Sequence, residues 1–385
     1  MSMSNLLMKK AVSKIFWWTL FVLLDCLIAF GISEGWIRLF VPVKNICYMI
    51  DAKIGVRFCP NQKTYGYVEK GYKSILVTNN LGFHDIDRNV EKSSGSYRIQ
   101  MYGDSFVQGA GVDRAETVPS LVEKALNSKD SSMQFEVMNM ATGEDGTSPE
   151  LLTYEEIGKN FHPDLVILYF RDDFPDNVMQ IHGRGFSPYH KIDSSGQLVY
   201  IPPAPKDAAP LWETFKKSSM LYRLLAIKIL ESKNYNDILK VKQELLHTVS
   251  NTVSPDKRNN KKSPEETRKT ICINESWPLT LRLIQSFKYQ AEKNGSHFML
   301  VDGQEFHDIN VGTVYSNKDL EEFSRMNHIN YIPSYKKHSE LTKSENTQRY
   351  MLRDGHLTAL GNKEMSVFLA DEIRTFFTRE RYVLK

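Results

Sequence analysis

The alternation of strand-like and helix-like segments after Tyr97 constrains the fold of this chain more than any other feature. Short runs rich in β-branched and aromatic residues alternate with longer amphipathic runs, a pattern typical of strands separated by helices. The strand-like runs are Arg98–Met101, Phe135–Asn139, Asp164–Phe170 and His297–Val301. The helix-like runs are Thr117–Asn127, Pro149–Lys159, Pro278–Asn294 and Leu360–Thr378. The pattern predicts an α/β fold, a doubly wound parallel sheet with a layer of helices on each face and three layers in all.

The alternation stops between Ile181 and Cys272. This stretch holds the turn-rich "IPPAPKDAAP", a helical run near Ser218–Glu231, and the polar run "VSPDKRNNKKSPEETRK", in which both charges are mixed. A polar run of this kind is typical of a solvated loop or linker. We therefore expect one α/β domain over 97–385 with an insertion at about 181–272, preceded over 33–96 by a juxtamembrane stretch and lead-in strands.

An apolar run near the N-terminus sets a second constraint. "IFWWTLFVLLDCLIAFGI", Ile15–Ile32, has 18 residues and a single charge, Asp25. This length is at the short end of what spans a bilayer. Lysines lie on its N-terminal side, which favours a cytoplasmic N-terminus; they are Lys9, Lys10 and Lys14. We expect residues 1–14 in the cytoplasm, a transmembrane anchor over 15–32, and an exported remainder, periplasmic in a Gram-negative cell. A cleaved signal peptide is the alternative, because Ala29-Phe30-Gly31 is a small-x-small site.

The composition bears on which partners, metals and cofactors the chain is expected to bind. The 49 basic and 46 acidic residues give a net charge of +3, and no basic stripe is visible, so nucleic acid is not an expected partner. The four cysteines show no zinc spacing, and we expect neither metal nor cofactor. Cys47 and Cys59 lie in the part expected to be exported, where a disulfide is permitted but not required.

One serine lies at a strand-to-helix turn. In "QMYGDSFVQGAGV", Gln100–Val112, Ser105 follows a strand-like run and is surrounded by glycines. In an α/β sheet, such a turn exposes either a nucleophile or a ligand-binding backbone. A phosphate cradle is disfavoured because no Lys-Ser/Thr pair follows the glycines. A nucleophilic Ser105 is the better interpretation, provided that the chain supplies a base.

The best candidate base lies near the C-terminus. "RDGHLTALGNKEM" places Asp354 and His356 just ahead of the last helix-like run. An Asp two residues before a His can accept the imidazole Nδ1–H, which fixes the tautomer and stabilises the imidazolium. We expect Ser105, His356 and Asp354 to form a catalytic triad.

These segments resemble the SGNH (GDSL-type) hydrolase family. "GDSFVQGAGV" matches the family's nucleophile block and "DGHLTALGNKEM" its terminal Asp/His block, with "VMNMATGEDGTSPELL" and "LVILYFRDDFPDN" similar to the second and third blocks. "DAKIGVRFCPN", "NNLGFHD" and "ESWPLTLRLIQSFKYQAEKNG" resemble membrane-anchored bacterial members that occur with exopolysaccharide genes. The resemblance implies a flavodoxin-like sheet, Ser105 as nucleophile, His356 as base, and polysaccharide-biosynthesis proteins as partners.

The resemblance also implies an oxyanion hole, and here the chain departs from the family. The family's donors are the nucleophile's N–H, a glycine N–H that falls at Gly143 or Glu144, and an Asn side chain in the third block. That Asn is replaced by Asp172, which would repel an oxyanion if ionised; one lost donor costs about 2.7–4 kcal/mol. Three alternatives stay open. Asp172 is protonated and donates, or Arg171 or Asn177 takes over, or the protein binds without hydrolysing.

The function implied is acyl transfer from an ester through acyl-Ser105, with water or a sugar hydroxyl as acceptor. The resemblance suggests an ester or O-acylated glycan of a cell surface as substrate. A catalytically impaired polysaccharide-binding or assembly protein is the main alternative. A lipid esterase would need an apolar acyl channel, which the sequence does not reveal.

Overall fold

The computed structural model describes residues 3–41, 45–69, 72–128, 133–143, 146–171, 177, 188–202, 219–222, 224–225, 264–303, 316–343, 350, 352 and 355–383. The chain divides into two compact units. The first unit comprises Met1–Asn45 and Asp207–Asn259, and the second comprises Ile46–Lys206 and Asn260–Lys385. The second unit contains the sheet and the candidate site, so it is described at greater length.

A five-stranded parallel sheet forms the centre of the second unit, in the order β11-β10-β7-β5-β6. Its strands are β5 (Ser96–Gly103), β6 (Gln134–Asn139), β7 (Leu165–Phe170), β10 (His297–Asp302) and β11 (Asn330–Ile332). Every residue of the central strand β7, "LVILYF", is buried. A parallel sheet covered on both faces requires such a continuous apolar strand, because neither face meets water.

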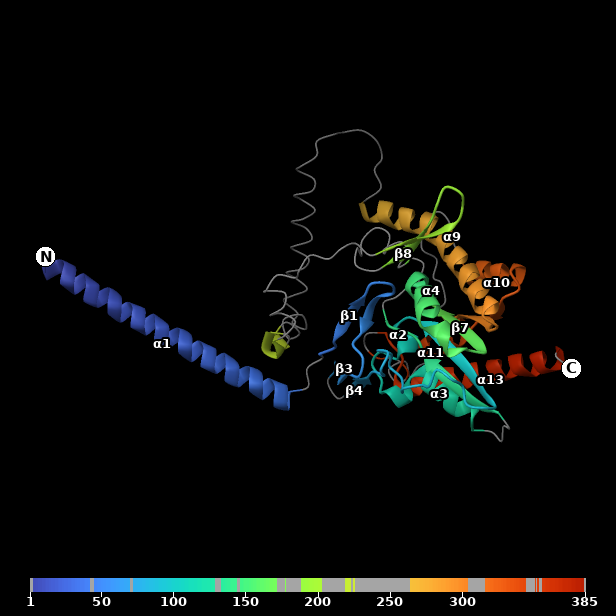
Figure 1. The fold of residues 1–385 in the computed structure, drawn as a ribbon, viewed down its shortest axis with the longest axis horizontal. Helices are drawn as coiled ribbons and strands as arrows, with labels where there is room; N and C mark the ends of the chain where they lie inside the picture. The colour runs from blue at the N-terminus through green and yellow to red at the C-terminus, as the bar shows by residue number, and fades with distance from the viewer. Residues whose placement is uncertain are drawn as a thin grey trace. The chain divides into compact units, whose positions relative to one another are not determined.

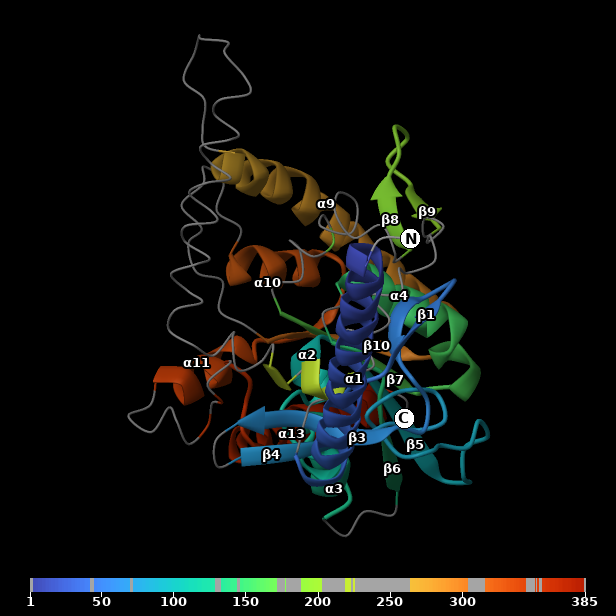
Figure 2. The same cartoon turned by 90° about the vertical axis from the view of Figure 1, so that its left-hand side faces the viewer.

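Helices cover both faces of this sheet (Figures 1 and 2). One face carries α3 (Val118–Leu126), α11 (Tyr335–Lys343) and α13 (Ala359–Val383), whose apolar residues share one core cluster. The other face carries α4 (Thr147–Glu156), α9 (Pro264–Lys293) and α10 (Asn317–Met326), which share the second cluster. The predicted three-layer, doubly wound parallel α/β fold is confirmed.

Several element boundaries differ from the predicted ones. Helix α9 begins at Pro264, so its predicted start at Pro278 is wrong and the end of the polar run is helical. A proline inside a helix removes one backbone hydrogen bond. Here Trp277, Leu279 and Leu283 are buried against the sheet, and this packing offsets the lost bond. The short β11 and the helices α10 and α11 were not predicted.

The first described element within the predicted insertion is a β-hairpin. Strands β8 (Tyr189–Ile192) and β9 (Leu198–Ile201) pair antiparallel around a turn in which Asp193 accepts three hydrogen bonds. The hairpin is fastened to the start of α4, because the Ser148 hydroxyl lies 2.8 Å from His190 Nδ1 and accepts the His190 N–H at 3.0 Å. The hairpin is therefore part of the second unit.

The lead-in segment also belongs to the second unit. It consists of two antiparallel pairs, β1 (Tyr48–Asp51) with β2 (Gly55–Phe58) and β3 (Lys63–Glu69) with β4 (Tyr72–Val77).

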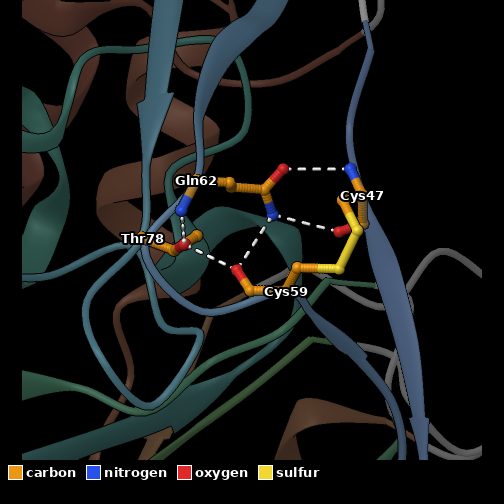
Figure 3. Close-up of a disulfide and its surroundings, with 4 residues drawn as sticks. All are labelled: Cys47, Cys59, Gln62 and Thr78. Carbon is orange, nitrogen blue, oxygen red and sulfur yellow. Dashed lines mark hydrogen bonds between the residues drawn. A yellow bond between two sulfur atoms is a disulfide. The ribbon is translucent and has the colours of Figure 1, made fainter.

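A disulfide joins Cys47 to Cys59 across the open end of the first pair (Figure 3). The Gln62 amide accepts from the Cys47 N–H and donates to the carbonyls of both cysteines, at 2.9–3.3 Å. The Thr78 hydroxyl donates to the Cys59 carbonyl at 2.7 Å. These bonds connect the β1–β2 pair to the β3–β4 pair.

The N-terminal helix α1 (Met3–Phe40) dominates the described part of the first unit. Its apolar segment, Lys14–Phe40, has 27 residues, and an 18-residue stretch within it has a mean hydropathy of 2.2 and is not buried. It is longer than the predicted anchor over 15–32. By length and composition this helix can cross a membrane, and an N-terminal signal sequence has the same properties.

Candidate active site

Strand β5 delivers Ser105 into a sharp turn at its carboxyl end. The strand ends at Gly103, Asp104 caps the four-residue helix α2 (Ser105–Gln108), and its Oδ1 accepts from the Phe106 N–H at 2.8 Å. Ser105 is thus the first residue of α2, and the N–H of a first helical residue has no acceptor within its helix. That N–H is available to an oxyanion.

Two glycines make the turn possible. A Cβ on Gly103 would lie 2.6 Å from Val107 Cγ2 and 2.9 Å from the Tyr169 carbonyl oxygen. Gly109 ends α2 in the left-handed region, with φ +83°, where a Cβ would overlap the Thr117 side chain. The close approach of strand, helix and neighbouring backbone explains why the sequence places glycines around the serine.

The structure brings His356 to Ser105. His356 Nε2 lies 2.7 Å from Ser105 Oγ, although 251 residues separate them, and both residues are half-buried. His356 lies in the loop just ahead of α13, and α13 packs beside α3 (Figure 2). The distance is that of a hydrogen bond between a nucleophile and its general base.

Three of the predicted site residues lie outside the described part of the chain. They are Asp354, Glu144 and Asp172. Their roles as orienting acid, oxyanion-hole residue and third-block residue stay predictions.

Gly143 lies against the nucleophile. Its φ is +48°, and a Cβ built on it would be 3.8 Å from Ser105 Cα and 2.6 Å from Gln108 Oε1. A side chain here would meet Gln108 and strain the backbone. The structure therefore places the Gly143 backbone beside Ser105, where the second N–H of an oxyanion hole is needed.

Asn177, a candidate replacement donor, has a different role. Its side chain is 1% exposed, and its Nδ2 donates to Thr280 Oγ1 at 2.7 Å and to Thr147 Oγ1 at 3.4 Å. Its Oδ1 accepts from the Ser148 N–H at 3.3 Å. Both amide hydrogens are used at the start of α4, so the expectation that Asn177 donates to the oxyanion is not supported. The side chain instead holds the N-terminus of α4.

Arg171, the other candidate donor, contacts both neighbours of the nucleophile. It follows β7, and its Cζ lies 3.1 Å from the centroid of the Phe106 ring. Its Nη1 lies 3.7 Å from Asp104 Oδ2. Burial raises the pKa of Asp104, and the Arg171 charge opposes that rise.

Asn139 and His84, which the sequence did not indicate as site residues, hydrogen-bond to the backbone that follows Ser105. Asn139, at the end of β6, donates from Nδ2 to the carbonyls of Val107, Gln108 and His84, at 3.1–3.3 Å. His84 Nδ1 lies 3.1 Å from the Gln108 carbonyl, and burial lowers the pKa of His84 to about 4. The imidazole is therefore neutral near pH 7, with its proton on Nδ1 toward that carbonyl.

Asn139 is held in turn by Asp85 of the lead-in segment. Asp85 accepts the Asn139 N–H at 3.1 Å, and burial raises the pKa of Asp85 to about 6. The segment "NNLGFHD", quoted above only for its resemblance, thus contacts the Ser105 turn directly through His84 and indirectly through Asp85 and Asn139. Its one distinguishing signal was the resemblance, because a buried His and Asp in a turn have no periodicity of their own.

Within the described ranges, no group of three or more His, Cys, Asp or Glu side chains could hold a metal ion. Around Ser105, the described residues bring together a hydroxyl, an imidazole at hydrogen-bond distance and the Gly143 backbone.

Comparisons with known proteins add the following. No protein-family model matches the chain, and no curated protein sequence matches it. Among solved structures, the psychrotrophic esterase EstA from Pseudoalteromonas sp. is similar at 9% identity and a TM-score of 0.38, over 73% of this chain and 98% of that one. The acetyl xylan esterase AlAXEase is similar at 13% identity and a TM-score of 0.37, over 72% and 98%.

A lipolytic protein of the G-D-S-L family from Desulfitobacterium hafniense DCB-2, described as putative, is similar at 10% identity and a TM-score of 0.35, over 71% of this chain and 98% of that one. All three are named as esterases or lipolytic proteins. Similarity at this level carries no argument about activity, so the functional conclusion rests on the geometry at Ser105.

Proposed function

We propose that this protein is a serine esterase or O-acyltransferase of the SGNH type that works through an acyl-Ser105 intermediate. The observation that carries the proposal is the 2.7 Å contact between Ser105 Oγ and His356 Nε2 at the carboxyl edge of a parallel sheet. Active sites of open α/β sheets gather at this edge.

The reaction begins with attack of Ser105 Oγ on the ester carbonyl carbon while His356 Nε2 takes the hydroxyl proton. The carbonyl oxygen becomes an oxyanion, which the Ser105 N–H and the backbone at Gly143 would stabilise. Collapse breaks the bond to the alcohol oxygen, and the imidazolium returns the proton to that leaving alcohol. Acyl-Ser105 remains.

The second half repeats the chemistry with a new nucleophile. Water or a sugar hydroxyl loses its proton to His356 Nε2 and attacks the acyl carbon, and the proton then returns to Ser105 Oγ. Water gives a carboxylic acid, and a sugar hydroxyl gives a new ester. Asp354, by its sequence position, would accept the Nδ1–H and stabilise the imidazolium.

The substrate we propose is an O-acylated surface glycan, with polysaccharide-biosynthesis proteins as partners. The support is the resemblance of the lead-in and α9 segments to membrane-anchored, exopolysaccharide-associated proteins. We further propose that α1 anchors the chain with its N-terminus in the cytoplasm and the second unit exported. The Cys47–Cys59 disulfide supports export, because disulfides persist in oxidising compartments.

One sequence feature favours a second candidate. Asp172 replaces the third-block Asn, as it would in a protein that binds glycan but has lost catalysis. The hydrogen-bonded Ser105–His356 pair argues against this, because a lost activity places no demand on that geometry.

The test uses the full-length protein in detergent. We expect it to hydrolyse p-nitrophenyl acetate and to be labelled at Ser105 by a fluorophosphonate, both of which Ser105→Ala abolishes. Ser128→Ala, at an exposed serine in the turn after α3 whose hydroxyl donates to the Ala125 carbonyl, is the matched control and should change neither. Labelling that survives in Ser105→Ala would identify a different nucleophile.

A further inference from the structure

Building on the proposed function, we infer that Arg171 is a positioning residue that clamps the nucleophile turn from both sides of Ser105 and supplies the counter-charge for Asp104. The role differs from that of an oxyanion donor. It links the end of β7 to the residues immediately before and after the nucleophile.

The clamp is visible in two contacts. Arg171 Nη1 lies 3.7 Å from Asp104 Oδ2, and its Cζ lies 3.1 Å from the Phe106 ring centroid. The side chains of Arg171 and Asp104 are 8% and 17% exposed, so water screens this ion pair less than one on the surface. A planar guanidinium can pair with a carboxylate and stack on an aromatic ring together, which an ammonium cannot do as well.

Arg171 also affects His356, through the Phe106 ring. The Phe106 ring lies 5.0 Å from the His356 ring at 34°, and 5.7 Å from the buried His338 ring. Because Arg171 fixes the Phe106 ring, it also fixes a surface against which His356 rests. One side chain thus orders both partners of the 2.7 Å Ser105–His356 contact.

The charge of Arg171 has a separate effect. Titratable groups that face Asp104 among the described residues include Arg171, His356 and Tyr169. Burial favours the protonated carboxyl, whereas the Arg171 charge favours the carboxylate. An ionised Asp104 favours the imidazolium that His356 becomes during attack. Without Arg171, the buried carboxyl would take up a proton at higher pH and that stabilisation would be lost.

Three substitutions separate geometry from charge. Arg171→Met removes both the contacts of the guanidinium with Asp104 and Phe106 and its positive charge. We expect kcat on p-nitrophenyl acetate to fall at least tenfold, with KM changed less than threefold. Here the acidic limb of the kcat profile means the pH range in which Asp104 takes up its proton and kcat loses the contribution of that charge. It should move up by about one pH unit or more, since a neighbouring cation shifts a carboxyl pKa by about 1–3 units. Arg171→Lys keeps the charge, so the limb should stay in place while kcat falls.

The decisive comparison repeats Arg171→Met in a protein that already carries Asp104→Asn. An Asn at position 104 still accepts the Phe106 N–H but carries no charge. There, Arg171→Met should no longer move the acidic limb. A limb that moves equally with and without Asp104 would overturn the counter-charge role. Unchanged kcat in Arg171→Met would overturn the clamp. Arg325→Gln, in an exposed pair with Glu322, is the matched control and should alter neither.

A stability readout keeps the clamp separate from the proposed function. Thermal unfolding of the wild type, Arg171→Met, Asp104→Asn and the double variant forms a cycle that does not depend on turnover. We expect the double variant to lose clearly less stability than the sum of the two single losses. If the wild type proves inactive on esters while this coupling is present, the proposed function fails and the clamp stands. Additive losses would refute the clamp even in an active enzyme.

Discussion

The Gly143 backbone lies beside Ser105: a methyl group at position 143 would lie 3.8 Å from Ser105 Cα, an ordinary van der Waals contact, and 2.6 Å from Gln108 Oε1, where it would overlap. This contact joins the second-block loop to the nucleophile turn. It gives the most direct test of the oxyanion hole within the described residues.

Gly143→Ala should lower kcat about 10- to 100-fold, because the new methyl group displaces either Gln108 or the backbone beside Ser105. Loss of a whole oxyanion donor corresponds to about 2.7–4 kcal/mol of barrier. Gly196→Ala is the matched control, since Gly196 has φ +81° in the β8–β9 turn and nothing within 4 Å of its missing Cβ. Both variants should show a similar small fall in Tm. Equal kcat values in the two would exclude Gly143 from the oxyanion hole.

Ser105→Ala and His356→Ala should each abolish turnover, and the double variant should lose hardly more than either single one. The residues act as a unit, so their effects on kcat are not additive. Asp354→Asn should leave a weak remainder. Steady-state rates with p-nitrophenyl acetate check all four variants, and near-UV circular dichroism checks that they fold. Multiplicative losses in the double variant would mean that the two residues work independently.

Asp172→Asn should raise kcat about tenfold, because it replaces a repulsive carboxylate with a donor; tenfold corresponds to roughly 1.4 kcal/mol. Asp371→Asn, at an exposed carboxylate paired with Arg374, is the control for a lost surface charge. A neutral outcome, together with wild-type activity that falls as pH rises, would indicate that Asp172 is protonated and donates. A clear loss of rate in a folded variant would give the carboxylate a different role.

Acidification should destabilise the fold between about pH 6.5 and pH 4. Burial lowers the pKa values of His84, His190 and His338 to about 4, well below the usual value near 6.5. Over that window the unfolded chain binds more protons than the folded one, so the free energy of unfolding falls as the pH falls. Asp85, with its pKa raised to about 6, has the opposite sign and offsets part of the loss.

Tm measured at pH 7.5 and at pH 5 checks this expectation. His190→Gln should lower Tm at pH 7.5, because it disturbs the bond to Ser148, but it should reduce the further drop at pH 5. His162→Asn, at an exposed residue with φ +49°, should leave that drop unchanged. A Tm that is equal at the two pH values would refute the expectation.

The sheet could be predicted because short apolar runs such as "LVILYF" alternate with longer amphipathic runs, as buried parallel strands alternate with helices. The sequence did not reveal β11, "NYI", because three residues are too few to show a period. The start of α9 was misplaced because Pro278 is typical of a first helical turn, and only the buried Trp277 and Leu279 show why the helix continues through it.

The site could be predicted in part. Ser105 and His356 lie in segments whose residue types and order indicate a nucleophile and a base, so their proximity was expected. The contacts of Arg171, Asn139 and His84 were not, because each depends on how separate strands end at one edge of the sheet. A single residue after a buried strand carries no pattern that shows which side chain it will touch.

His356 lies within the last 30 of 385 residues, whereas Ser105 lies in the first third of the chain. The Ser105 turn and its proposed base therefore come from segments that are far apart in the sequence. In the proposed reaction, a chain cut by a protease ahead of α13 would keep Ser105 and lose the base that deprotonates it, so such a cut should abolish turnover.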